Sequence, residues 1–259
     1  MFYMDCRRYV LFSSLLILSG TKLYAGTMGA TSDFDGFSAG LGAGYVNTNS
    51  SKWTDVTMVS PFPVVTEYFR GDDIKSSLSP VVNANYLYAF DNQWLLGLKG
   101  LYKYLGVQHS KIAWSGTFQN GTYQQADFHT NIIQEFFLTV EAAYEFIPNW
   151  MVYLGFGPAV TGVKNELRGN LLESTAFNFQ YTEKSSRKTV WGGAGQLGFE
   201  YLLPHRFAID VSYNLIVSPT TDISPIYFRT NATNYYSKFL GQIQLLEQGL
   251  NVTINKYFA

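Results

Sequence analysis

Three histidines and one acidic pair are the residues of this sequence best suited to catalysis. Histidine assisted by serine or a carboxylate hydrolyses lipid or peptide bonds, and an Asp-Asp pair can serve a protease. His109 and His129 lie in one long segment, His205 lies in a short turn, and Asp72 is followed by Asp73. No supporting serine and carboxylate are evident, and an acidic turn in a solvated loop is far commoner than an acidic active site. The sequence therefore predicts no catalytic residue.

Cofactor and metal chemistry is not indicated either. There is no glycine-rich phosphate-binding loop and no cluster of metal ligands at the usual spacings. The single cysteine, Cys6, precedes an N-terminal apolar run that we expect to be removed, which would leave no thiol for a disulfide or a metal. We therefore expect a non-enzymatic protein without a cofactor.

The composition excludes several classes of protein. Charged residues make up 14% of the 259 residues and aromatic residues 17%; an average soluble protein has roughly 25% charged residues. The formal net charge is -1, so no basic excess favours nucleic-acid binding. The mean hydropathy of -0.02 is too low for a protein with several membrane-spanning helices. The apolar residues must instead alternate with polar ones.

The N-terminus has the pattern of a secretory signal peptide. Arg7 and Arg8 precede an apolar stretch at 9–18, and Ala25 is a small residue suited to cleavage. The stretch is shorter than the about 20 apolar residues of a transmembrane helix, which makes an uncleaved anchor the less favoured alternative. We expect residues 1–25 to be a signal peptide and residues 26–259 to form one exported domain.

Three short turns recur at a nearly constant interval. Each places an aromatic residue after three turn-forming residues, at Trp94, Trp150 and Phe207, which are 56 and 57 residues apart. A fixed interval indicates a repeated supersecondary unit. On both sides of each turn the sequence alternates with a period of two, as β-strands with two different faces do. We count eight such strands, near 36–46, 80–90, 94–105, 132–146, 150–161, 190–202, 207–217 and 248–258.

The two faces of these strands differ in a way that indicates a membrane. One face carries aliphatic residues with aromatics at its ends, whereas the other carries glycine, serine, asparagine and a few charges. An eight-stranded barrel has little internal space, so small and polar residues suit its interior. We therefore predict an all-β, closed, antiparallel up-and-down transmembrane β-barrel of eight strands. Its predicted aromatic girdle consists of Phe90, Trp94, Phe146, Trp150, Tyr201, Phe207 and Phe258.

The lengths of the connections give this barrel an orientation. Short turns alternate with long connections near 47–79, 106–131, 162–189 and 218–237, as periplasmic turns alternate with extracellular loops in outer-membrane barrels. The turns, of the form Phe-x-x-x-Trp, and the last strand at 249–258 resemble those of the eight-stranded outer-membrane barrels of the OmpA, OmpX and opacity-protein type. Ala259, which follows the terminal aromatic Phe258, departs from that pattern by one residue.

The resemblance implies a Gram-negative-type outer-membrane location and contact with outer-membrane lipid and lipopolysaccharide. It also implies assembly by the barrel-assembly machinery through the C-terminal strand, and no peptidoglycan-binding domain, because no chain follows that strand. Lipopolysaccharide phosphates would be met by basic residues of the long connections. These are Lys111, Lys164, Arg168, Lys184, Arg187, Lys188 and Arg229.

Strand register places the charged residues of the polar face inside the barrel. The short turn at 91–93 puts Asn85 opposite Lys99, and a three-residue turn at 119–121 puts Lys99 opposite Glu141. We interpret the resulting network as a polar core that plugs the barrel and holds it closed; an ion path or gate is the alternative. The predicted members are Asn85, Lys99, Lys103, Glu135 and Glu141, with Gln196, Glu200 and Asp210 as further candidates.

The long connections are the predicted working parts. Residues 107–130 continue to alternate, so this hairpin is expected to project from the barrel, where its sheet could pair with a partner strand. The last connection, 219–236, is rich in Thr, Asn and Tyr, as adaptable recognition surfaces are. We expect a structural or surface-interaction, adhesin-like role toward a host or cell-surface ligand. The alternatives are an outer-membrane enzyme acting on lipid or peptide and a narrow, porin-like pore.

Overall fold

A computed structural model describes residues 32–59, 65–90, 93–117, 123–168, 179–181, 185–230 and 236–258, with side chains at 32–50, 74–90, 93–109, 129–166, 185–222 and 243–258. The predicted signal peptide lies outside the described residues. No helix among the described residues is long and apolar enough to span a membrane. The strands are β1 (Gly36–Val59), β2 (Val65–Ala89), β3 (Trp94–Thr117), β4 (Tyr123–Ile147), β5 (Trp150–Arg168), β6 (Phe179–Tyr181), β7 (Ser185–Leu203), β8 (Phe207–Val217), β9 (Thr221–Thr230) and β10 (Tyr236–Phe258).

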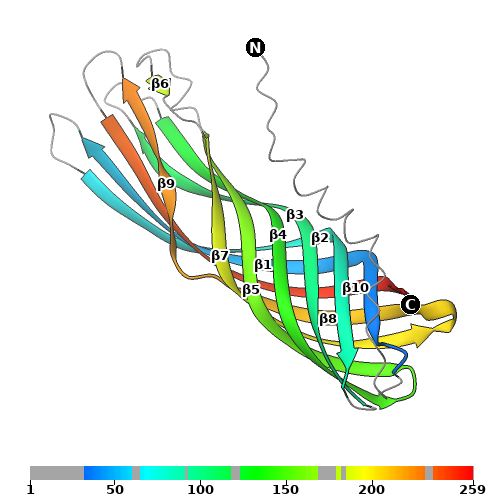
Figure 1. Cartoon of the computed structure of the whole chain (residues 1–259). Coiled ribbons are helices and arrows are strands. Elements are labelled where there is room, and N and C mark those ends of the chain that lie inside the picture. Colours follow the sequence, from blue (N-terminus) through cyan, green and yellow to red (C-terminus); the bar gives the residue numbers. More distant parts are fainter. Residues whose placement is uncertain are drawn as a thin grey trace, which may run out of the picture. The chain divides into compact units, whose positions relative to one another are not determined.

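Eight of these strands form a closed antiparallel ring. Neighbours pair in the order β1-β2-β3-β4-β5-β7-β8-β10, and β10 pairs back onto β1 to close the circle (Figure 1). Beyond the end of β8, β9 pairs with the remaining part of β10, and β6 pairs with β9. Strands that follow one another in the ring also follow one another in the chain, so the ring is an up-and-down barrel. The predicted fold class is confirmed.

Large apolar side chains lie on the outside of the ring. Leu41 of β1 is 68% exposed and Phe156 of β5 is 62% exposed, whereas Tyr153, on the other face of β5, is buried. On β3 the outward apolar positions run from Trp94 to Tyr104. Ten residues at a rise of ~3.3 Å and a tilt of about 40° span about 25 Å, the height of a lipid-facing band. The exterior therefore has the surface of a membrane-spanning barrel.

Aromatic side chains gather at the end of the ring with the short turns, here called the turn end. The rings of Trp94 and Tyr144 lie 4.8 Å apart, and Phe258 stacks on Phe37 at 5.8 Å. The other predicted girdle residues also lie at this end, namely Phe90, Phe146, Trp150, Tyr201 and Phe207. Aromatics of this kind occupy the boundary between hydrocarbon and water.

At the opposite end, here called the hairpin end, the strands are longer than predicted. β1 continues to Val59 and β2 begins at Val65, so most of 47–79 is strand and not a long connection. The same correction applies to parts of 162–189 and 218–237, whereas strand through most of 106–131 agrees with the projecting hairpin expected there. In β1, β2 and β10 ladder pairing continues beyond the strand limits that the alternation predicted. Sequence periodicity therefore marked the full length of the β3–β4 hairpin but only the lipid-facing part of those strands.

The β3–β4 hairpin departs from the predicted register. Near its tip Thr117 pairs with Tyr123, in agreement with a three-residue turn, but two bulges then shift the ladder. Trp94 consequently pairs with Tyr144, two residues before the partner expected for an unbroken ladder. One bulge contains Gly106, whose φ of +61° glycine adopts at little cost.

The shifted register changes which charged residues face each other. Lys99 lies opposite Thr139 and not opposite Glu141, so that predicted pairing is wrong. Lys103, expected one diagonal step from Glu135, is its direct ladder partner. The same shift gives His109 and His129 the partners Thr130 and Ser110 instead of Asn131 and Lys111.

Ladder pairing stops on two sides of the ring toward the hairpin end. Between β2 and β3 the last pair is Val81 with Lys103, and the preceding residue of β2 is Pro80. Between β7 and β8 pairing ends at Val217, two residues before Pro219. Proline has no N–H to donate to a ladder, so pairing ends readily beside it. Within the described strands, no ladder pair joins β2 to β3 or β7 to β8 beyond these points.

We call these unpaired boundaries seams: the first lies between β2 and β3 beyond the pair Val81–Lys103, and the second lies between β7 and β8 beyond Val217. The two seams divide the hairpin end into two sheets. One sheet contains β2, β1, β10, β9 and the short β6, and the other contains β3, β4, β5 and β7. Four ring strands separate the seams in each direction, so the seams face each other across the ring. The two groups of strands diverge at the hairpin end in Figure 1. Side-chain contacts join the two sheets beside the first seam: Ser77 Oγ donates to the Leu105 carbonyl at 2.9 Å, and His109 Nε2 of β3 lies 2.9 Å from Thr48 Oγ1 of β1.

Residues 32–35, just before β1, pack at the turn end. Phe34 is fully buried and meets the ring of Tyr257 edge-on at 5.9 Å. Asp35 Oδ1 accepts a hydrogen bond from the Ala89 amide at 3.0 Å. The segment therefore links the start of β1 to β10 and to the end of β2, a role that the sequence pattern did not reveal.

Phe34→Ala is expected to lower the free energy of unfolding by about 3 kcal/mol, because it removes a fully buried aromatic ring. Urea unfolding of the refolded protein in detergent micelles, followed by tryptophan fluorescence, measures this change. Phe90→Ala is the matched control, because Phe90 is 59% exposed and should cost under about 1 kcal/mol. Equal effects of the two substitutions would contradict the packing of Phe34.

Candidate functional site

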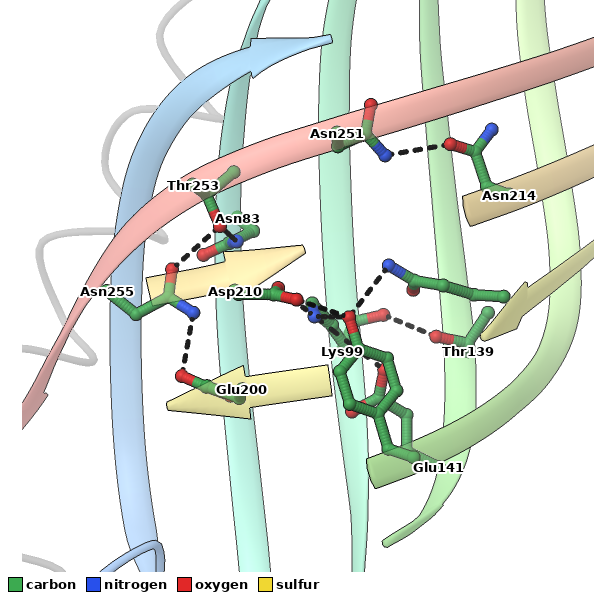
Figure 2. Close-up of polar contacts among 12 residues, drawn as sticks. Asn83, Lys99, Thr139, Glu141, Glu200, Asp210, Asn214, Asn251, Thr253 and Asn255 are labelled. Carbon is green, nitrogen blue, oxygen red and sulfur yellow. Dashed lines mark hydrogen bonds and ion pairs between the residues drawn. The ribbon is translucent and has the colours of Figure 1, made fainter. Parts of the chain in front are cut away.

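Lys99 of β3 is the centre of a buried polar cluster inside the ring. Its Nζ lies 2.6 Å from Asp210 Oδ2 of β8 and donates to the hydroxyl of Tyr153 of β5 at 2.7 Å. The Tyr153 hydroxyl in turn donates to Asp210 Oδ1 at 2.8 Å. Glu141 of β4 lies further away, with Oε1 4.0 Å from Nζ. Figure 2 shows the Lys99 and Asp210 side chains converging from different strands.

A run of hydrogen bonds continues along the inner wall beside this cluster. Asn255 donates from Nδ2 to Glu200 Oε1 at 3.0 Å, and Thr253 donates to Asn255 Oδ1 at 3.2 Å. Asn83 of β2 donates to the Thr253 hydroxyl at 2.9 Å (Figure 2). Polar side chains therefore connect β7, β10 and β2 across the interior.

A second buried cluster surrounds Lys103, nearer the hairpin end. Its Nζ donates to Glu247 Oε1 of β10 at 2.8 Å and lies 3.3 Å from Glu135 Oε1 of β4. The ammonium also lies 5.4 Å from the ring centroid of Phe137, within range of a cation–π contact. A small cavity beside this cluster, lined by Glu135, Glu247 and Thr48 among others, has about the size of one water.

An apolar layer separates the two charged clusters. Leu101 lies between Lys99 and Lys103 on β3 and belongs to a packed group of buried side chains. Each member comes from a different strand of the ring: Val81, Leu101, Phe137, Ala159, Ala194 and Ile216. These side chains pack together from six of the eight ring strands, with none from β1 or β10, and their packing favours a closed interior over a continuous water-filled path.

All predicted members of the polar network lie buried inside the ring, namely Asn85, Lys99, Lys103, Glu135, Glu141, Gln196, Glu200 and Asp210. The structure brings Lys99 together with Asp210 and Glu141, and Lys103 together with Glu135. Asn85 is the ladder partner of Lys99, but among the described residues its Oδ1 has no hydrogen-bond partner.

Two members of the clusters were not anticipated. Tyr153 lies between the outward residues Val152 and Leu154, so the strand alternation indicated that its side chain points inward. It was missed because aromatic residues were assigned to the lipid-facing side. Glu247 lies one residue before the predicted start of the last strand at 248. A longer strand would have placed it inside the ring by parity alone.

The clusters bury more acidic than basic groups. The described interior contains two lysines and five carboxyl groups, which are Glu135, Glu141, Glu200, Asp210 and Glu247. Buried charges are tolerated only with close partners, and both ammonium groups have them. Within the described part of the chain, no three His, Cys, Asp or Glu side chains are grouped as a metal site requires. The arrangement is suited to holding the strands together.

The histidines do not share a site. His109 is fully buried, with Nε2 2.9 Å from Thr48 Oγ1, whereas His129 lies on the outer face, with Nδ1 2.8 Å from Gln108 Nε2. His205 is exposed in the turn between β7 and β8. The side chains of the acidic pair at 72–73 lie outside the described residues. The geometry therefore adds no catalytic arrangement to these candidates.

A closed ring of eight strands with an apolar band outside and packed side chains inside defines a membrane-spanning β-barrel, because closure satisfies the backbone hydrogen bonds within the lipid. The chain belongs to the family of the outer membrane protein beta-barrel domain, whose family model matches residues 13–238. It is a protein of the outer membrane, and the resemblance to eight-stranded outer-membrane barrels is confirmed.

Solved structures of other outer-membrane proteins are similar to this chain. The outer membrane protease OmpT from Escherichia coli shares 8% identity over 90% of this chain and 99% of that chain, with a TM-score of 0.50. OprG from Pseudomonas aeruginosa shares 14% identity over 86% of this chain and 97% of that chain, with a TM-score of 0.47. Ail, the attachment invasion locus protein of Yersinia pestis, shares 14% identity over 86% of this chain and 99% of that chain, with a TM-score of 0.34. At these identities the likeness concerns the fold alone. No curated protein matches the chain.

Proposed function

We propose that this protein is a non-enzymatic surface-interaction barrel that binds an adhesin-type ligand through its hairpin end. The observation that carries the proposal is the length of the strands beyond the lipid-facing band. β1 continues from Tyr45, the last outward aromatic of its band, to Val59, which is about 45 Å along the strand at ~3.3 Å per residue. A barrel that served only as a structural element of the membrane would not need such an extension.

The hairpin end is proposed to face the outside of the cell. Tight turns at one end and long hairpins at the other are the pattern of outer-membrane barrels, in which the turns are periplasmic. The connection between β4 and β5 is a tight turn at 148–149, with Asn149 at a positive φ, whereas β1 and β2 extend far beyond the band. This orientation puts both sheets of the hairpin end in contact with the surroundings.

Unpaired strand edges supply a means of binding. Along the first seam, β2 at 65–79 and β3 at 104–117 have no ladder partner on the seam side among the described strands. Exposed edges of this kind present N–H and C=O groups to which an extended segment of another protein can add as a strand. The filled interior supports a binding role over the alternative of a pore.

Shortening the β1–β2 hairpin tests this function. Deletion of 51–72, with the ladder partners Ser50 and Asp73 joined by an Asn-Gly turn, removes 65–72 of the β2 edge together with the β1 segment that pairs with β10 at 236–244, and it leaves the ring. Bacteria that display this variant should attach to cultured epithelial cells about tenfold less than bacteria that display the wild type. Deletion of 167–184, with the ladder partners Glu166 and Ser185 joined in the same way, is the control that keeps the first seam.

Heat-modifiable migration on a gel must show that both variants fold. Unchanged attachment of the 51–72 deletion would refute a role of this edge. Hydrolysis of labelled lipid A or peptide by the wild type, abolished by His109→Ala, would establish the enzymatic alternative instead. A large, steady conductance in planar bilayers would establish the pore.

A further inference from the structure

We propose that Glu135 and Glu247 share one proton, and that this proton holds the two sheets of the hairpin end together. Both carboxyl groups contact the same ammonium, because Lys103 Nζ lies 3.3 Å from Glu135 Oε1 and 2.8 Å from Glu247 Oε1. All three side chains are buried. Two carboxylates and one ammonium would leave a negative charge without a counterion in the interior, which is costly unless one carboxyl group is neutral.

The two carboxyl groups are placed to share a proton. They lie within hydrogen-bonding reach of each other, and two carboxyl groups form such a bond only when one of them is protonated. No described group donates a hydrogen bond to either oxygen of Glu135. A proton needs no further space. The cavity beside the pair has room for one water, and much of its lining is aliphatic, from Ile132, Ile216 and Leu245, which bind no cation.

The three residues lie where the two sheets begin to separate. Lys103 belongs to the last ladder pair before the first seam, and Glu247 adjoins Leu246, whose ladder partner Val217 marks the start of the second seam. Lys103 and Glu135 belong to β3 and β4 of one sheet, whereas Glu247 belongs to β10 of the other. Loss of the proton makes both carboxyl groups negative, so their repulsion acts between the two sheets.

Few other titratable or charged groups face this cluster among the described side chains. His109 lies further along β3 and contacts Thr48 of β1, and the exposed Lys75 of β2 is the ladder partner of Thr48. The described inward residues of the other strands at this level are uncharged, namely Ser79, Thr161, Val190 and Ile216. Histidine ordinarily changes its charge near neutral pH, so His109 needs a control of its own.

The distance between spin labels on the two sheets tests the shared proton. Ile74→Cys on β2 and Arg187→Cys on β7 place the labels at exposed positions on opposite sides of the ring, and the single natural cysteine, Cys6, lies in the predicted signal peptide. Between about pH 6 and about pH 9, glutamate and lysine in water keep their charges, so the shared proton is the one to be lost. In detergent micelles the distance should lengthen by about 5 Å, one strand spacing, as the pH rises.

Neutral variants identify the responsible group. Glu135→Gln should keep the short distance over the whole pH range, because Lys103 and Glu247 then balance each other. Glu247→Gln leaves the same charge balance with Glu135 and serves if Glu135→Gln does not fold. Glu141→Gln is the matched control, because it makes the same change in the Lys99 cluster, where β3 is still paired with both neighbours; it should retain the wild-type lengthening. His109→Gln should retain it as well.

Several results would overturn the proposal. These are a constant distance in the wild type, equal lengthening in the wild type and in the folded glutamine variants of Glu135 or Glu247, and loss of the response in His109→Gln. Lengthening when choline chloride replaces sodium chloride at constant pH would identify a bound sodium ion instead of a proton.

Separation of the sheets widens the seams, so the proton would control access to the strand edges. That consequence rests on the proposed surface-binding function. The label distance is measured without any ligand, whereas attachment to epithelial cells is measured at one pH. Failure of the shared proton and failure of the binding function can therefore be told apart.

Discussion

Lys99→Ala is expected to lower the free energy of unfolding by about 3 to 5 kcal/mol. The substitution leaves the buried Asp210 carboxylate without the ammonium that lies 2.6 Å away, and the removal of one partner of a buried ion pair typically costs that much. Tyr153 also loses the hydrogen bond that it accepts from Lys99. Urea unfolding in micelles and the temperature at which the folded band disappears from a gel both measure the effect.

The two carboxyl groups near Lys99 should respond differently when each is neutralised. Asp210→Asn is expected to cost about 2 to 3 kcal/mol, because the carboxylate accepts charge-assisted bonds from Lys99 and a bond from Tyr153. Glu141→Gln should cost under about 1 kcal/mol, because its nearest oxygen lies 4.0 Å from the ammonium and neither oxygen has a hydrogen-bond partner among the described residues. Equal effects, or a silent Lys99→Ala, would show that the cluster is arranged differently.

Gly157→Ala is expected to destabilise the barrel by about 3 kcal/mol or more and to reduce the yield of folded protein. A Cβ at this position would overlap the carbonyl oxygen of Leu138 and lie 2.9 Å from its carbonyl carbon and 3.0 Å from the Thr139 Cα. Backbone atoms of a paired strand cannot move aside as a flexible side chain can, so the β4–β5 ladder must separate. The fraction of heat-modifiable protein after refolding into micelles measures the loss.

Gly193→Ala is the matched control for this substitution. Gly193 also lies within a ring strand, as the ladder partner of Pro158 on the neighbouring β5, but a Cβ there would meet no atom within 4 Å. The substitution should leave stability within about 0.5 kcal/mol of the wild type. A fully folded Gly157→Ala protein would contradict the close approach of β5 to β4.

The barrel and its lipid-facing surface could be predicted because they depend only on whether apolar residues occupy every second position of a strand. Residues such as Leu41 and Phe156 share a face with other apolar residues at every second position, and one face must meet the hydrocarbon. Parity also placed Lys99, Lys103 and Glu135 inside, because the other face of the same strands is the interior. These conclusions do not require a knowledge of which residues pair.

Pairing across strands was less accessible, because a bulge changes register without changing the alternation on either side over short distances. Gly106 is one of many glycines in the sequence, and only the three-dimensional ladder shows that it sits in a bulge. The partner of Lys99 at 2.6 Å, Asp210, is more than a hundred residues away, so the β3–β4 register alone could not identify it. Phe34 precedes the first strand, where no periodicity exists to assign a packing site.

The seams beside Pro80 and Pro219 have a consequence for how this surface can change over time. Since no ladder pairs join the two sheets along the described parts of these seams, lengthening or exchanging the outer part of one hairpin should leave the backbone pairing of its counterpart and of the membrane anchor unchanged. Insertions that add one residue to each arm of a hairpin preserve the pairing of all residues between the insertion and the membrane-spanning ring. Natural variants should therefore differ mainly in the exposed arms, which would let a bacterium replace the epitopes seen by antibodies or phages while it keeps the same anchor.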